Sequence, residues 1–549
     1  MNRYPFTLYL LFFLMSFMFV SAQKQEKPKL VVGIVIDQMR YDYLYRFSDK
    51  FGDNGFKKLL KKGYNLENTH YNYIPTYTAV GHSSIYTGTT PQNHGIIGNN
   101  WYDKFLKKRI YCVDDRNYSS IGTNSASGKK SPYRLHTTTI TDQLRLAQNL
   151  KGKTISIAIK DRSAILPGGH TANGVYWFEG GKEGNWITSS FYMNELPEWV
   201  KNFNANGKVE AYCNTIWNTY YPIETYTESI TDNNPYEGRF KGESAPVFPH
   251  NIPELKKQNG NYNILKSIPA GNSITTDFTI AAIEGEKLGF SENQTDFLAI
   301  SYSSTDYVGH RYGVDSKEIE DTYIRMDLEL ERLLNYLDKT VGKKNYTLFL
   351  TADHAVAQTP NYLKSLKIPG GYFENTEFNN FIKKISLEQF GSDKIVEQIS
   401  NYQLFLNKSE LKKLNLKTAD VENFFAEELL AFDKVYKTIT ANILQSNEFS
   451  IGLYSKVQQG YNQKLSGNVI IIPDPSVIGS GNKKTGTTHG SGYSYDTHVP
   501  LIFFGKGVQQ GSSNSYCPII DIAPTLANFL KIEFPNGVTG NVIEGVFKN

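Results

Sequence analysis

Long apolar runs with few polar interruptions recur along the chain and constrain its fold more than any other feature. The clearest are LVVGIVID (30–37), TISIAIKDR (154–162), DFLAISYSSTD (296–306), YTLFLTADH (346–354), NVIIIPD (468–474) and VPLIFFG (499–505). Continuous apolar character, rather than strict alternation, is typical of strands buried on both faces, as in a parallel sheet. Helical patterns lie between the runs. We therefore expect an α/β fold with an open, mostly parallel central sheet and helices on both faces.

The clearest helical pattern covers residues 318–341. Its apolar positions form one face, made of Ile319, Tyr323, Met326, Leu330, Leu333, Leu334 and Leu337. Two stretches do not follow the alternation: 167–275, rich in Asn, Gly, Pro and Tyr, and 356–485, with extra helices and a short strand signal, YQLFL. We interpret both as cap insertions in a single catalytic domain of residues 23–549.

The first 22 residues differ from the rest of the chain. Arg3 is their only charged residue, and an apolar stretch, Phe6–Val20, leads to the small residues Ser21 and Ala22. This pattern predicts a secretory signal peptide over 1–22, cleaved near Ala22. The alternative is a membrane anchor, but the stretch is shorter than the roughly 20 residues that a spanning helix needs. We expect a periplasmic or fully secreted protein, with no stable membrane insertion after cleavage.

Composition excludes several classes of protein. The chain has 40% hydrophobic and 20% charged residues, which is ordinary for a globular protein and excludes disorder or a coiled coil. A net charge of +4, with no basic stripe, argues against a nucleic acid partner. Cys112, Cys213 and Cys517 allow at most one disulfide, so the core must stabilise the fold, with or without bound metals. A monomer is the expected state.

Acidic and imidazole side chains follow several predicted strands at their carboxyl ends, where open α/β sheets bind ligands. They are Asp37, Asp306, His310, Asp353, His354 and His489. Singly, an Asp at a strand end often caps the next helix. Together, three carboxylates and three imidazoles suit two zinc-like ions that each keep a position open for substrate. The histidines without this context are expected to be structural or at the surface: His70, His82, His94, His136, His170, His250 and His498.

A candidate nucleophile lies in YIPTYTAVGHSSIYTG (73–88). A turn containing Pro75 leads into a helical stretch from Ala79, which places Thr78 at a helix start. A helix N-terminus offers free backbone N–H groups and a positive dipole end, both favourable to a phosphate. The alternative is that Thr78 is only an N-cap. With metal ligands in the same chain we favour the nucleophile, because zinc lowers the pKa of a bound hydroxyl.

Three further side chains suit an anion. Lys160 and Arg162 alternate at the end of the predicted strand 154–162, so both can point to one side. Asn99 lies in a turn flanked by glycine, GIIGNNWYD, and can donate its amide. The alternative is that these charged side chains, like many at strand ends, only contact solvent. Here an Arg fork and a Lys point charge would neutralise a doubly charged phosphoryl group.

These segments resemble the alkaline phosphatase superfamily, most closely the PafA-type, phosphate-insensitive periplasmic alkaline phosphatases. The resemblance spans nearly the whole mature chain and rests on segments in fixed order: LVVGIVIDQMR, IPTYTAVGHSSIYTG, GNNWYD, KDRSAILPGGH, STDYVGH, TADH and TTH. It implies an alkaline-phosphatase-like fold. It also implies hydrolysis of small-molecule phosphate monoesters to an alcohol and inorganic phosphate.

The resemblance further implies a role for each site residue. Two zinc ions per chain would be bound. One would be held by Asp37, Asp353, His354 and the Thr78 oxygen, and the other by Asp306, His310 and His489. The phosphoryl oxygens would be contacted by Asn99, Lys160 and Arg162. Thr78 would attack phosphorus in line to give a phosphothreonine, which water then hydrolyses. One departure is Ala355, where many relatives carry Gly; a positive φ there would add strain.

Other functions fit the sequence less well. A phosphodiesterase or nucleotide pyrophosphatase on the same fold would share the metals and Thr78. Lys160 and Arg162 favour a monoester, because its dianion can use two cations. A sulfatase needs Cys-x-Pro-x-Arg, and CVDDR (112–116) has Asp114 at the Pro position. A metal-dependent phosphate-binding protein is the non-enzyme alternative, but binding alone needs no nucleophile at a helix start.

Overall fold

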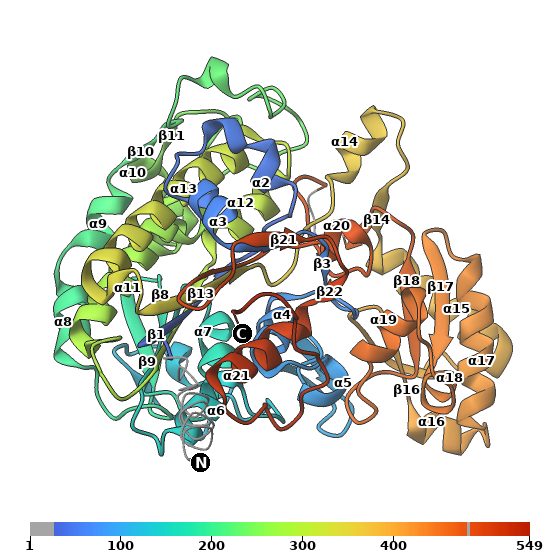
Figure 1. The fold of residues 1–549 in the computed structure, drawn as a ribbon. Coiled ribbons are helices and arrows are strands. Elements are labelled where there is room, and N and C mark those ends of the chain that lie inside the picture. The colour runs from blue at the N-terminus through green and yellow to red at the C-terminus, as the bar shows by residue number, and fades with distance from the viewer. Residues whose placement is uncertain (1–26, 480–483, 549) are drawn as a thin grey trace, which may run out of the picture.

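A ten-stranded sheet forms the centre of the computed structural model, which describes residues 27–479 and 484–548 (Figure 1). Its strand order is β21-β2-β20-β13-β1-β12-β7-β8-β9-β6. The bounds are Gly511–Ser513 (β21), Tyr64–Leu66 (β2), Leu501–Gly505 (β20), Tyr346–Thr351 (β13), Leu30–Ile36 (β1), Asp296–Tyr302 (β12), Thr154–Ala158 (β7), Gly174–Glu179 (β8), Asn185–Ser189 (β9) and Ser120–Ile121 (β6). The predicted signal peptide, 1–22, lies outside the described residues.

The middle of this sheet is parallel. β1 lies between β12 and β13 and runs parallel to both, and β7 and β8 continue the parallel order beyond β12. Every residue of β1, β12 and β13 is buried, which explains why these strands are apolar throughout. β20, from the run predicted at 499–505, pairs antiparallel with β13. The predicted mostly parallel central sheet is therefore confirmed, with antiparallel strands toward its edges.

Helices cover both faces of the sheet (Figure 1). On one side lie α11 (Ala270–Glu286) and α13 (Lys317–Leu337), and on the other α4 (Thr78–Thr87), α6 (Ile140–Ala147), α7 (Asp161–Gly168) and α21 (Ile522–Leu530). The helix predicted over 318–341 is α13, followed by a short π-helical segment, Asp338–Gly342. All seven residues of its predicted apolar face are buried, so the helix packs as its periodicity indicates.

The apolar run at 468–474 does not join the central sheet, and its assignment there was wrong. It forms β18 (Val469–Pro473) in a separate antiparallel sheet of four strands, with the order β15-β16-β18-β17. The other strands are Val396–Ser400 (β15), Gln403–Leu406 (β16) and Val435–Thr440 (β17). Val469 and Ile471 belong to one apolar cluster, and Ile470 and Ile472 to another. The run is apolar throughout because both faces of β18 are buried, and not because the strand pairs in parallel.

The four-stranded sheet and its helices form the part of the molecule at the right of Figure 1. The helices are α15 (Asn375–Phe390), α16 (Lys408–Lys413), α17 (Thr418–Glu428), α18 (Ala441–Ser446) and α19 (Gly452–Gly460). The short strand predicted from YQLFL is β16. The other predicted insertion, 167–275, is not wholly separate from the central sheet, because it contains β8 and β9.

Two further observations concern the chain as a whole. Cys112, Cys213 and Cys517 are all buried free thiols, and none of them forms a disulfide. Across the described residues, we find no helix with both the length and the apolar character needed to cross a membrane.

Candidate metal centre and nucleophile

The carboxyl ends of the central strands bring the predicted ligands to one edge of the sheet. They are Asp37 after β1, Asp306 and His310 on α12 (Ser304–Tyr312) after β12, Asp353 and His354 after β13, and His489 from the loop before α20 (Ser494–Thr497). They form two groups of three residues, each with ligand atoms close enough to share one metal ion.

The first group is Asp37, Asp353 and His354, all fully buried. His354 Nε2 lies 3.6 Å from Asp37 Oδ1 and 3.4 Å from Asp353 Oδ2. Neither carboxylate oxygen has a hydrogen-bond partner in the described part of the chain. Burial, then the charge of Asp353, raises the pKa of Asp37 well above its usual value, and burial raises that of Asp353 to about 7. Buried, unpartnered carboxylate oxygens fit a bound cation.

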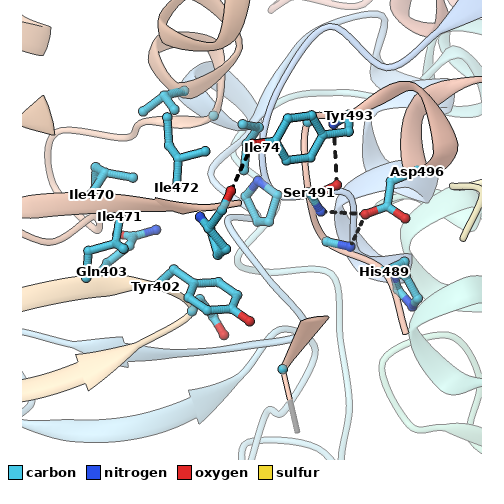
Figure 2. Close-up of a pocket in the computed structure, with 18 of the residues that line it drawn as sticks. Ile74, Tyr402, Gln403, Ile470, Ile471, Ile472, His489, Ser491, Tyr493 and Asp496 are labelled. Atoms are coloured by element: carbon cyan, nitrogen blue, oxygen red, sulfur yellow. Dashed lines mark hydrogen bonds between the residues drawn. The ribbon is translucent and has the colours of Figure 1, made fainter. Parts of the chain in front are cut away.

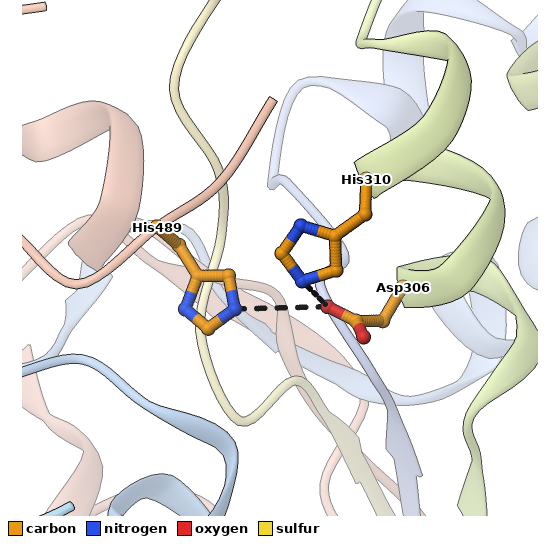
Figure 3. Close-up of side chains that lie close together, drawn as sticks. All are labelled: Asp306, His310 and His489. Carbon is orange, nitrogen blue, oxygen red and sulfur yellow. Dashed lines mark ion pairs between the residues drawn. The ribbon is translucent and has the colours of Figure 1, made fainter. Parts of the chain in front are cut away.

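The second group is Asp306, His310 and His489 (Figure 3). His310 Nε2 lies 3.0 Å from Asp306 Oδ1, and His489 Nε2 lies 3.7 Å from the same oxygen. The groups adjoin, because the rings of His354 and His489 stack with centroids 3.4 Å apart. Two cations held here would therefore be close neighbours.

The imidazoles of both groups are oriented for metal binding. Each Nδ1 lies against a backbone carbonyl: His354 on Ala355 O (3.0 Å), His310 on Thr487 O (2.8 Å) and His489 on Thr76 O (2.7 Å). An Nδ1–H that donates to a carbonyl leaves Nε2 with its lone pair toward the carboxylates, as metal-binding histidines require. Burial, then His310, lowers the pKa of His489 to about 3, which keeps that ring neutral. The donor set therefore fits two zinc-like ions.

Lys160 lies between the two groups. Its Nζ is 2.7 Å from Asp37 Oδ2 and 2.5 Å from Asp306 Oδ2, and the residue is only 3% exposed. Burial opposes the positive charge, but the two carboxylates outweigh it and raise the pKa of Lys160. Burial likewise opposes charge on Asp306, yet His310 and Lys160 hold its pKa well below the usual value. Lys160 is thus a permanent cation at the junction of both groups.

Thr78 is the first residue of α4 and not its N-cap, which is Tyr77. Its Oγ1 lies 3.3 Å from His354 Nε2, so the hydroxyl reaches the first group. α4 approaches the end of β13 closely because of Gly81, where an added Cβ would lie 2.0 Å from Asp353 O. The simple N-cap interpretation of Thr78 therefore does not hold.

Asn99, beside the start of α4, and Arg162, in the first turn of α7, carry side-chain donors. Asn99 Oδ1 accepts the N–H of Ala79 (2.8 Å), which turns its amide nitrogen away from α4. Arg162 donates from Nη1 to Tyr111 Oη (3.2 Å), while its buried Nε has no acceptor among the described residues. A buried donor without an acceptor, like a free amide beside a helix N-terminus, suits an anionic ligand.

Two local predictions need correction. β7 ends at Ala158, so Lys160 is the N-cap of α7 and Arg162 lies in its first turn; they do not alternate on a strand. The turn into α7, rather than strand alternation, directs both side chains. Ala355 is absent from the residues with positive φ in the described chain, so the Gly-to-Ala departure adds no strain there.

Gln38 and His82 contact the carboxylates of the site, although the sequence analysis did not single out Gln38 and expected His82 to be structural or at the surface. Gln38 has a φ of 68°, its N–H donates to Asp353 Oδ1 (3.2 Å), and its Nε2 donates to Asp306 Oδ1 (2.7 Å). It therefore links both groups. His82, one turn after Thr78, is fully buried with Nδ1 3.4 Å from Asp353 Oδ2. The sequence does contain one indication of its position: His82 follows Thr78 by four residues, and residues four apart lie on the same face of a helix.

The four-stranded sheet forms one wall of a pocket that reaches His489. Figure 2 shows an apolar pocket with isoleucines of β18 and Tyr402 on one side and His489 on the other. Asp496 Oδ2 accepts the N–H groups of Gly490 and Ser491, which fixes the loop beside His489. Tyr402 also lines a wider groove of about 620 Å³ together with Tyr77, the neighbour of Thr78.

Comparison with known proteins identifies the class. The family described as "Type I phosphodiesterase / nucleotide pyrophosphatase" matches residues 31–494. The chain belongs to this family, within the alkaline phosphatase superfamily.

Three relatives cover nearly the whole chain. A Myroides odoratus protein named "Calcium-transporting ATPase" is 45% identical over 530 residues, 96% of each chain. Alkaline phosphatase PhoV of Synechococcus elongatus is 45% identical over 539 residues (96% of this chain, 94% of that one). Alkaline phosphatase PafA of Elizabethkingia meningoseptica is 42% identical over 531 residues, 96% of each chain. A crystal structure of wild-type PafA matches with a TM-score of 0.91 and 41% identity, covering 95% of this chain and 99% of that one.

Proposed function

We propose that this protein is an exported alkaline phosphatase that hydrolyses small-molecule phosphate monoesters, with two zinc ions and a phosphothreonine at Thr78. One observation carries the proposal: two N/O donor groups adjoin each other, and the group with unpartnered buried oxygens, Asp37, Asp353 and His354, reaches the Thr78 hydroxyl. Two near-full-length relatives named alkaline phosphatases support the same activity. The name of the Myroides odoratus relative describes a transport activity rather than ester hydrolysis.

The residues of the chain have separate tasks in this mechanism. Zinc ions bound to the two groups would supply Lewis-acid stabilisation of the attacking and leaving oxygens. Thr78 Oγ1 loses its proton and attacks phosphorus, and the bond from phosphorus to the ester oxygen breaks. That oxygen keeps the electron pair, takes up a proton and leaves as the alcohol. Water then attacks the phosphothreonine, which releases inorganic phosphate and restores the Thr78 hydroxyl. Asn99 and Arg162 hold the phosphoryl oxygens from the α4 and α7 sides, and Lys160 adds a positive charge. Because the transition state of phosphoryl transfer is loose, this positioning and neutralisation provide most of the catalysis.

The nearest alternative is a diesterase, since the family description includes diesterases. Lys160 and Arg162 favour the monoester. A dianionic phosphoryl group can use both cations, whereas a diester carries one charge and an additional group that must find space near Arg162. We propose the monoester as the substrate on this ground.

The ratio of kcat/KM for an aryl phosphate monoester to that for the matching aryl methyl diester tests the proposal on zinc-loaded protein. We expect a ratio well above one. Arg162→Ala should lower kcat/KM for the monoester more than for the diester, because only the dianion uses both cations. A wild-type ratio below one would favour the diesterase, and turnover of neither substrate would favour a phosphate-binding protein.

Export is a separate part of the proposal and has its own test. Cell fractionation followed by N-terminal sequencing should yield mature protein from the periplasmic or extracellular fraction, beginning near residue 23. Full-length protein confined to the membrane fraction would instead support the anchor.

A further inference from the structure

Asp496 is a buried carboxylate that lies beside the two metal groups and belongs to neither of them. It is the third residue of α20 and is only 1% exposed. Its side chain points toward the loop that follows His489 (Figure 2). The mechanism proposed above gives it no task. Because burial of a carboxylate costs free energy, its hydrogen bonds show what it holds in place.

The side chain of Asp496 fixes the loop that carries His489. Its Oδ2 accepts the N–H groups of Gly490 (3.0 Å) and Ser491 (2.7 Å). Residues 487–491 form no helix or strand. Gly490 has a φ of 132°, and an added Cβ there would lie 2.6 Å from the Tyr77 ring, so the backbone fits closely. Two hydrogen bonds to one buried oxygen therefore hold a segment that has no regular secondary structure.

The same loop is joined to the segment that leads to the nucleophile. His489 Nδ1 lies 2.7 Å from Thr76 O, and the Thr76 hydroxyl donates to Ser491 O (2.9 Å). These contacts connect residues 489–491 to the chain two residues before Thr78. A displacement of the loop would therefore move the His489 ring relative to the other ligands and disturb the start of α4.

The backbone of Asp496 reaches the first metal group. Its carbonyl oxygen accepts the N–H of Ala355 (2.9 Å), and Ala355 O lies 3.0 Å from His354 Nδ1. Asp496 thus contacts the residue that follows a histidine ligand in each group: Gly490 after His489, and Ala355 after His354. One residue outside both groups therefore connects the chain segments that carry these two stacked imidazoles.

We propose that Asp496 is a positioning residue for the metal centre and that its side chain acts through His489. The inference rests on the proposed two-zinc function, because the orientation of an imidazole affects zinc affinity only where zinc binds. Contacts that orient metal ligands typically contribute about 10–100-fold to metal affinity. The carbonyl of Asp496 can hold Ala355 in every variant, so substitution of the side chain affects the second group, which contains His489.

Zinc affinity tests the proposal without an activity measurement. Competition with a chelator should give two zinc ions per chain for the wild type. Asp496→Ala should weaken one of them by about 10–100-fold and leave the other unchanged. Asp496→Asn should bind both ions as the wild type does. It keeps an oxygen that can accept both N–H groups, and its amide nitrogen takes the place of Oδ1, which has no hydrogen-bond partner among the described residues.

Asp327→Ala is the matched control. Asp327 is also buried, and it accepts two backbone N–H groups, those of Gly52 and Phe56, rather than groups of a ligand loop. Its loss should lower the free energy of unfolding and leave both zinc affinities unchanged. Thr76→Val is a milder variant of the same loop, because it removes only the hydroxyl bond to Ser491 and keeps the Thr76 carbonyl. It should weaken the same ion as Asp496→Ala, to a smaller extent.

A double-mutant cycle shows whether the effect passes through His489. His489→Ala alone should weaken the ion of the second group. Adding Asp496→Ala should then cost little further affinity, because the ring that Asp496 positions is already absent. Additive losses would overturn the proposal, since they would indicate a general loosening of the fold. Two tightly bound zinc ions in Asp496→Ala, or unchanged affinities in Thr76→Val where Asp496→Ala does not fold, would overturn the positioning role alone. A wild type that binds no zinc would overturn the proposed function as well.

Discussion

β1 and β18 are both apolar throughout, yet only β1 ends at a site with chemistry. The neighbours of β1 in the sheet, β12 and β13, run parallel to it, so the residues after all three strands meet at one edge. The neighbours of β18, β16 and β17, run antiparallel to it, so their carboxyl ends lie at the opposite edge. The same sequence signal therefore leads to a functional edge only where the strands are parallel.

The largest expected effect is on kcat/KM, and it distinguishes two threonines that lie at the starts of helices. Thr78 is the first residue of α4 and lies at the metal groups, whereas Thr440 is the N-cap of α18, where its side chain accepts the Ile443 N–H. Thr78→Ala should lower kcat/KM by at least about 10³-fold, because it removes the nucleophile. Thr440→Ala should destabilise the protein by about 1 kcal/mol and leave kcat/KM unchanged.

Steady-state kinetics and acid-quenched detection of phosphothreonine check the threonine pair. Thr78→Ser is the conservative control and should retain most of the activity with a phosphoserine in its place. If Thr78→Ala kept wild-type turnover, the covalent mechanism would be wrong, whatever the metals do.

The next expected effect comes from one substitution made in both sheets. Ile34 in β1 and Ile471 in β18 are both buried, at 0% and 3% exposure. Truncation of either to Ala should lower the free energy of unfolding by about 2–5 kcal/mol. Only Ile34→Ala should also lower kcat/KM, by about tenfold, because a small shift of β1 misplaces Asp37. Denaturant unfolding with kinetics on the folded fraction measures both effects, and an equal kinetic loss in Ile471→Ala would contradict the comparison.

Sequence patterns predicted the strands and the residues at their ends, because apolar runs and strand–helix alternation are local signals. The patterns failed where pairing decides the outcome: nothing in NVIIIPD distinguishes a strand in a parallel sheet from one buried between two clusters, as β18 is. They also missed Gln38, whose left-handed backbone and two contacts depend on segments more than 260 residues away. The alternation inferred for Lys160 and Arg162 failed because α7 begins directly after Lys160.

A smaller effect concerns buried carboxylates outside the metal groups. Asp327 on α13 accepts the N–H groups of Gly52 and Phe56, and burial raises its pKa to about 6. Because this folded pKa lies above the unfolded value of about 4, the folded state binds the proton more tightly. Its contribution to stability is therefore present at low pH and is lost as pH rises through 6.

The unfolding free energy of the wild type relative to Asp327→Asn should fall by about 1 kcal/mol between pH 5 and pH 7. In the four-stranded region, burial also raises the pKa of Glu422, so Glu422→Gln should show a trend of the same sign. Denaturation midpoints at matched pH values measure both differences. Parallel stability curves for wild type and Asp327→Asn would show that the folded carboxyl does not titrate in this range.

The smallest effect tests whether the four-stranded sheet acts on catalysis at all. At the tip of the β15–β16 hairpin, Asn401 Nδ2 donates to Asn100 O (2.7 Å), the residue after Asn99. Asn401 has a φ of 52°, so Asn401→Gly removes this contact without backbone strain. We expect kcat/KM to fall about threefold with little change in KM, since one lost hydrogen bond loosens the loop that orients Asn99. Asn401→Asp retains the size but not the donor and should match Asn401→Gly. Unchanged kinetics in both variants would limit the four-stranded sheet to a wall of the pocket beside His489, whereas a fall confined to Asn401→Asp would point to charge repulsion.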